Sequence, residues 1–145
     1  MDKQARILIV DDDENIRRTM TAILEDEGYI VDSAASGKEA IEKANGAIYN
    51  LALLDIRLPD MEGVELLKLM KESVPRTRKI MVTGYPSMHN AISAVNKRAD
   101  AYLIKPVDIE KLLETVKEQL KLREEENNFN EMKVAEFIES RVKEL

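Results

Sequence analysis

Several polar residues in this sequence could act together in chemistry, because they come directly after short apolar runs. They are Asp11, Asp12, Asp55, Thr83 and Lys105, which follow the runs ILIV, LALL, KIMV and AYLI. A carboxylate at the edge of a core is costly unless a cation matches its charge. Lys105 is one such cation. Mg²⁺ suits the role of a second, because it binds a few carboxylate oxygens and keeps waters that leave room for phosphate oxygens.

This set of groups is suited to phosphoryl transfer. A carboxylate flanked by Mg²⁺ and an ammonium group can attack phosphorus and become an acyl phosphate. The metal and Lys105 would neutralise the oxygens of the transferred phosphoryl group, and Thr83 adds a hydroxyl at the same rim. The chemistry requires that the ends of several strands meet in one place.

The apolar runs predict the strands that would bring these residues together. Strands are expected at residues 7–10, 29–34, 51–54, 79–82 and 101–104, and four of the five runs are nearly continuous, as in parallel strands covered on both faces. Amphipathic patterns between them predict helices. We therefore predict an α/β fold: a doubly wound, five-stranded parallel sheet in the flavodoxin-like order 2-1-3-4-5, with flanking helices. In that order the carboxyl ends of strands 1 and 3 are neighbours, so their carboxylates converge.

Local signals mark the ends of these helices. Asp13 and Asp108 are expected to cap the first and fifth helices, and Gly28 to end the first. Ser36 and Glu39 form a capping box, in which each side chain bonds the backbone N–H of the other residue. The apolar stripes of the fourth and fifth helices are Ala91, Ile92 and Val95, and Ile109, Leu113, Val116 and Leu120.

The segment after Leu120 differs from the rest of the chain. The run REEENN is polar, and a new apolar pattern follows at Val134, Ile138, Val142 and Leu145. We therefore divide the chain into a domain at residues 1–122 and a C-terminal helical extension or linker at residues 123–145. A seamless coiled coil over residues 109–145 is not expected, because the stripe of the fifth helix would continue through polar residues. Self-association of the new stripe is the favoured way to bury it.

Composition excludes several classes of function. The chain has 145 residues with 28 acidic and 22 basic side chains, a net charge of -6, which argues against direct nucleic acid binding. The chain has no cysteine, so disulfides, thiol catalysis and cysteine-based zinc sites are excluded. No apolar run reaches the roughly 18 residues of a membrane span. We expect a cytoplasmic protein with no membrane contact.

The ordered motifs at the strand ends resemble the receiver domain of two-component response regulators. The matching segments are Asp11-Asp12 after ILIV, Asp55 in LLDIRLPDMEG, Thr83-Gly84 in MVTGY, and Tyr102 with Lys105-Pro106 in AYLIKPVD. Each motif is a weak signal by itself, but five in this order, each at a strand end, are a strong one. The resemblance covers roughly residues 5–122.

The resemblance implies a role for each residue of the acidic set. Asp55 would be the phosphoacceptor. Asp12 and Asp55 would bind Mg²⁺ directly, with the main-chain carbonyl of Arg57 as a further ligand, and Asp11 would assist through water or from just outside the ligand set. Lys105 would pair with Asp55 and then with its phosphate.

The same resemblance implies a switch. Thr83 would move to bond a phosphate oxygen, and Tyr102 would turn inward as Thr83 moves. The Lys105–Pro106 peptide bond would be cis, which the tertiary amide permits at low cost. The partner would be a histidine kinase or phosphotransfer protein. A homodimer could form through the face of the fourth helix, fifth strand and fifth helix, or through the C-terminal helix.

Three functions remain open from the sequence. The leading one is a phosphorylation-activated signalling switch rather than a turnover enzyme. The second is a Mg²⁺-dependent phosphohydrolase, but such enzymes usually carry an acid/base Asp two residues after the nucleophile, where this chain has Arg57. The third is a receiver-like interaction module that is not phosphorylated, although no acidic or lysine position is lost. The output, through protein contact or a further domain, is not predicted.

Overall fold

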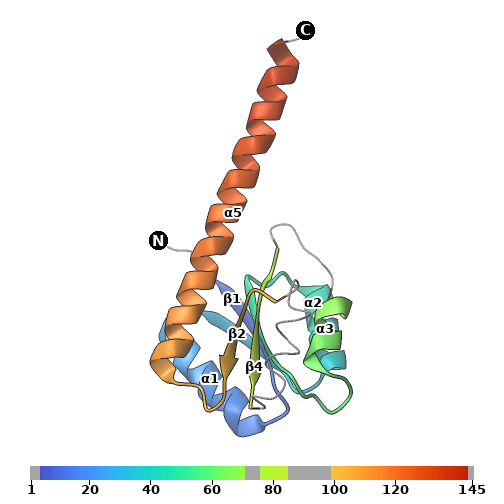
Figure 1. Ribbon diagram of the computed structural model, residues 1–145, viewed down its shortest axis with the longest axis vertical. Helices are drawn as coiled ribbons and strands as arrows, with labels where there is room; N and C mark the ends of the chain where they lie inside the picture. The colour runs from blue at the N-terminus through green and yellow to red at the C-terminus, as the bar shows by residue number, and fades with distance from the viewer. Residues whose placement is uncertain (1–3, 71–75, 85–98, 144–145) are drawn as a thin grey trace.

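The computed structural model describes residues 4–70, 76–84 and 99–143, and it has the predicted doubly wound architecture (Figure 1). The strands are β1 (Arg6–Val10), β2 (Ile30–Ala34), β3 (Leu51–Asp55), β4 (Arg78–Thr83) and β5 (Ala101–Ile104). All neighbouring pairs are parallel, and the sheet order is β2-β1-β3-β4-β5, which confirms the prediction. The carboxyl ends of four strands therefore meet where the strand order reverses, beside β1 and β3.

The helices cover both faces of the sheet. They are α1 (Glu14–Asp26), α2 (Gly37–Gly46), α3 (Gly63–Leu69) and α5 (Ile109–Lys143). Side chains alternate across each strand: Ile7 and Ile9 pack with Met20 of α1 and Val116 of α5, while Leu8 packs on the other face with α2 and α3. This two-sided burial explains why the strands are continuous apolar runs in the sequence. The predicted fourth helix around Ala91, Ile92 and Val95 lies outside the described residues.

The helix ends follow their local signals with one correction. Asp13 caps α1 by accepting from the N–H groups of Asn15 and Ile16 at 2.9 and 3.2 Å, and Gly28 has φ of 96°, the left-handed value expected after a helix. Ser36 caps α2 as predicted, but Glu39 accepts from the N–H of Ala35 at 2.8 Å rather than from that of Ser36. The box therefore closes one residue earlier in the chain.

Helix α5 buries three of the four residues of its predicted stripe at least in part, and it continues beyond the predicted domain boundary. Val116 is buried, and Leu113 and Leu120 pack against the core as predicted, whereas Ile109 is 53% exposed and Leu112, outside the predicted stripe, is buried. The helix runs without a break through the expected boundary between residues 122 and 123, over 35 residues. Its last turns extend past the sheet as an arm, which we define as residues 127–143 (Figure 1).

Candidate functional site

The first carboxylates of the site come from the loop between β1 and α1. Asp11 is 3% exposed, and its Oδ1 accepts from the N–H of Asp13 at 2.9 Å, so the α1 cap and the site share one loop. Arg17 on α1 donates to the main-chain oxygen of Asp11 at 2.7 Å. Asp12 is exposed. Its side chain is thus accessible to an incoming group, while Asp11 is held in the wall of the site.

Asp55 ends β3 and completes the acidic cluster. It is 5% exposed, and oxygens of Asp11, Asp12 and Asp55 lie within 4.8 Å of one another. Such oxygen donors are the type that Mg²⁺ prefers. The ammonium of Lys105 contacts the carboxylates of Asp11 and Asp55, whereas the guanidinium of Arg17 donates to the main-chain oxygen of Asp11. The donor set and its excess of negative charge therefore fit a divalent cation.

Lys105 bridges two of the three carboxylates from the end of β5. Its Nζ lies 2.9 Å from Oδ2 of Asp11 and 3.5 Å from Oδ2 of Asp55. The sequence predicted a pairing with Asp55, and the structure places the shorter contact on Asp11. The Asp55 carboxylate therefore lies near the Lys105 ammonium, but the shorter contact of that ammonium is with Asp11.

The electrostatics of the site distinguish Asp55 from an ordinary surface carboxylate. Burial raises the pKa of Asp55, the charge of Asp11 raises it further, and Lys105 together with the N–H of Arg57 only partly offsets the rise. Burial by itself would lower the pKa of Lys105, but its hydrogen bond to Asp11 and the charges of Asp55 and Asp11 outweigh burial and raise it. Lys105 therefore stays protonated at neutral pH. A bound cation would stabilise the charged form of Asp55, which burial and Asp11 disfavour.

The predicted switch residues lie on the neighbouring strands. Thr83 ends β4 and is fully buried, and its main-chain oxygen accepts from the N–H of Lys105 at 2.7 Å. Tyr102 on β5 is 36% exposed, at the surface of the outermost strand. The Lys105–Pro106 peptide bond is cis. The structure thus brings Thr83 to the rim with the carboxylates and leaves Tyr102 turned partly to solvent.

The loop after β3 is shaped by contacts that sequence reasoning did not find. Asp60 accepts from the N–H groups of Gly37 and Lys38, both at 2.9 Å, and these bonds lower its pKa. This carboxylate thereby joins the loop that follows the phosphoacceptor candidate to the start of α2. Asp60 precedes Met61-Glu62-Gly63 in a turn-rich segment, but nothing local in the sequence identifies a partner more than 20 residues away.

Gly63 allows the same loop to approach β3 closely. Its N–H donates to Ile56 at 2.7 Å, and a Cβ at this position would collide with the carbonyl oxygen of Asp55. We expect Gly63→Ala to lower the free energy of unfolding by about 1–3 kcal/mol, the usual cost of overpacking. Because the added Cβ would displace the main-chain carbonyl group of Asp55, any phosphorylation of this residue should also slow.

The matched control for this change is Gly46→Ala, where a Cβ meets nothing within 4 Å. Urea unfolding should leave the midpoint of the Gly46 variant near that of the parent or above it, because alanine favours a helix over glycine. Equal midpoints for the two variants would show that Gly63 is not needed for the close approach.

Comparisons with known proteins agree with this geometry. Residues 7–117 match the sequence profile of the response regulator receiver domain. The chain is 39% identical over 118 residues to the transcriptional regulatory protein ZraR of Klebsiella oxytoca, covering 81% of this chain and 27% of ZraR. The chain therefore spans about a quarter of that relative's length.

Solved structures show the same fold. A CheY-like receiver domain protein from Methanospirillum hungatei JF-1 superposes with a TM-score of 0.78 at 50% identity, covering 86% of this chain and 99% of that one. The response regulator TrrA from Thermotoga maritima, solved in complex with Mg²⁺ and BeF, superposes with a TM-score of 0.72 at 33% identity. The match covers 80% of this chain and 99% of TrrA.

Among the residues that the structure describes, no helix has both the length and the apolar character needed to cross a membrane.

Proposed function

Because the chain belongs to the response regulator receiver domain family, we propose that it is a phosphorylation-activated switch that accepts a phosphoryl group on Asp55. The donor is a histidine kinase or phosphotransfer protein, and the reaction depends on Mg²⁺. One observation carries this proposal: a buried carboxylate at a strand end shares a single lysine with a second carboxylate, and an exposed third one lies beside them.

The residues divide the work of phosphoryl transfer. An oxygen of Asp55 attacks phosphorus, and the new O–P bond forms as the bond from phosphorus to its leaving group breaks. Asp12, Asp55 and the main-chain carbonyl of Arg57 would hold Mg²⁺, and Asp11 would assist. When bound, the metal neutralises negative charge on the phosphoryl oxygens. Lys105 contributes a second cation on the other side of Asp55, and the Thr83 hydroxyl bonds a phosphate oxygen once the group has arrived.

The same residues favour a switch over a hydrolase. A phosphohydrolase needs a group that gives and takes a proton beside the nucleophile. Two residues after Asp55, where phosphohydrolases usually carry an aspartate, the chain has Arg57, which offers no carboxyl group for this proton exchange. The acyl phosphate should therefore persist long enough to act as a signal.

Incubation with acetyl phosphate and Mg²⁺ tests the proposed function directly. The intact mass should rise by one phosphoryl group, and chelating the metal should prevent the rise. Hydroxylamine should remove the group, because acyl phosphates react with nucleophilic amines and phosphate esters do not. A protein that takes up no phosphoryl group under these conditions is instead a receiver-like interaction module.

We also propose that the chain self-associates through the arm. The arm exposes apolar side chains, which is unfavourable in water. With their exposed fractions they are Phe129 (54%), Met132 (56%), Val134 (57%), Phe137 (59%), Ile138 (57%) and Val142 (61%). On β5, which belongs to the alternative dimer face, Tyr102 and Ile104 are 36% and 47% exposed, so this strand is accessible to a second copy as well.

Deletion of residues 128–145 should leave a folded, phosphorylatable domain that associates less than the full chain. The apolar row of the arm is lost, whereas the buried core residues that the structure describes all lie before the deletion. Sedimentation velocity at matched concentrations measures the change. The double substitution Val134→Asn and Ile138→Asn should have the same effect without shortening the arm. Full-length and truncated proteins that sediment equally as monomers, with and without phosphorylation, would exclude the arm as a dimer contact.

A further inference from the structure

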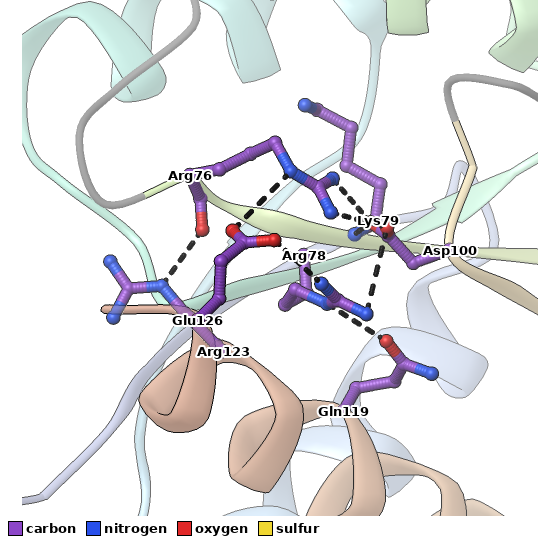
Figure 2. A network of polar contacts seen from close by, with 7 residues as sticks. All are labelled: Arg76, Arg78, Lys79, Asp100, Gln119, Arg123 and Glu126. Carbon is purple, nitrogen blue, oxygen red and sulfur yellow. Dashed lines mark hydrogen bonds and ion pairs between the residues drawn. The ribbon is translucent and has the colours of Figure 1, made fainter. Parts of the chain in front are cut away.

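A cluster of polar side chains lies where β4 and β5 begin (Figure 2). The acidic site lies at the other, carboxyl ends of the strands. Its centre is Asp100, just before β5, whose side chain is 10% exposed. Its two oxygens lie 2.8 and 3.0 Å from the guanidinium of Arg76, and one of them accepts from the N–H of Lys79 at 2.7 Å. Arg78 Nη2 is 3.8 Å from the same carboxylate. This half of the cluster is tightly bonded within the sheet.

Helix α5 supplies the other half from three positions on one face. Oε1 of Gln119 accepts from Nε of Arg78 at 3.0 Å, and Nε of Arg123 donates to the main-chain oxygen of Arg76 at 2.9 Å. Glu126 lies 3.7 Å from Arg78 and 3.8 Å from Arg76. Residues four and then three positions apart lie on the same face of a helix. Consecutive turns of α5 therefore contact the residues at the start of β4.

Burial makes these contacts costly to break. Arg78 is 9% exposed and Gln119 is 5% exposed. A buried guanidinium or amide that loses its partner carries an uncompensated desolvation cost. The helix therefore cannot leave the sheet at residue 119 without exposing or orphaning these groups. All three α5 residues lie beyond residue 117, where the family match ends.

We propose that Arg76, Arg78, Asp100, Gln119, Arg123 and Glu126 form a joint that fixes the direction of the arm, so that the arm moves with the receiver domain as one body. The segment after residue 122 is then not a flexible linker. The joint also has a direct mechanical path to the acidic site. β4 begins at Arg78 and ends at Thr83, while β5 lies between Asp100 and Lys105. With the joint in place, a displacement of β4 or β5 at the acidic site also displaces the arm. A flexible hinge after residue 122 would uncouple the two.

The absence of cysteine makes the joint measurable with pairs of spin labels on introduced cysteines. Glu42→Cys on α2 and Glu136→Cys on the arm are both at exposed positions. The labelled full chain is diluted into an excess of unlabelled protein, so that only distances within one molecule are recorded. The joint variant carries Arg123→Ala and Glu126→Gln. Its control carries the parallel changes Lys121→Ala and Glu125→Gln at exposed neighbours on the same helix.

Parent and control should each give one narrow distance distribution, and the joint variant should give one at least twice as wide. Amide hydrogens of residues 119–126 should exchange at least tenfold faster in the joint variant, with the exchange of α1 unchanged as evidence that the domain remains folded. Glu126→Gln alone, at a position 40% exposed in its side chain, should widen the distribution less, because its contacts are longer than that of Arg123. Equal widths in the joint variant and the control, or a broad distribution in the parent, would overturn the proposal. None of these measurements requires Asp55 to be phosphorylated.

Discussion

Asp55→Asn should abolish phosphorylation by acetyl phosphate and Mg²⁺. The amide keeps the shape of the side chain but removes the anionic oxygen that attacks phosphorus and one of the proposed metal ligands. Intact mass spectrometry should therefore show no added phosphoryl group at times when the parent is fully labelled. The matched control is Asp26→Asn, the same chemical change at an exposed position on α1, which should be labelled like the parent. Undiminished labelling of the Asp55 variant would place the phosphoacceptor elsewhere.

Loss of labelling in this variant should not come from loss of folding. The pKa of Asp55 is raised in the folded protein by burial and by Asp11. A carboxyl whose folded pKa exceeds its unfolded pKa contributes stability below the unfolded pKa and loses it as the pH rises through the folded pKa. At neutral pH, without metal, the Asp55 charge therefore opposes folding. Asp55→Asn should melt at a higher temperature than the parent in a metal-free buffer, and the difference should shrink as the pH is lowered.

Asp12→Asn should weaken Mg²⁺ binding by at least tenfold, or about 1.4 kcal/mol. Asp12 is the exposed member of the acidic cluster, so its loss removes a ligand with little effect on packing. Isothermal titration calorimetry measures the affinity. Asp13→Ser is the matched control, because it removes a neighbouring negative charge and keeps a residue that can cap α1. If both variants bind Mg²⁺ equally well, Asp12 acts only through its charge.

The affinity for Mg²⁺ should also depend on pH in a direction set by Asp55. Protons compete with the metal for this carboxylate, and its raised pKa means that the competition begins at a higher pH than for an ordinary aspartate. Binding should therefore weaken as the pH falls toward the acidic range. In Asp55→Asn the remaining weak binding should lose most of this dependence. A pH profile that is unchanged by the substitution would assign the dependence to another group.

The sequence by itself determined the strands, their order and the residues at their ends. Buried parallel strands are continuous apolar runs, so Ile7 to Val10 and Leu51 to Leu54 could be recognised without a structure. Asp55 and Lys105 follow their runs directly, and parallel strands bring their carboxyl ends to one edge. Asp13 was predictable as a cap because its partners are two and three residues away. Each of these signals is local or follows from strand order.

Only the tertiary structure decided which of these groups contact one another. Lys105 lies closer to Asp11 than to Asp55, and Asp60 reaches the start of α2, because loop shape sets distances that no local pattern records. On α5, Leu112 is buried and Ile109 is exposed, because the packing of the helix on the sheet selects among its apolar side chains. The contacts of Arg78 with Asp100 and Gln119 join three segments far apart in the chain. Such long-range contacts depend on how the folded elements pack, so the anchoring of the arm emerged only from the structure.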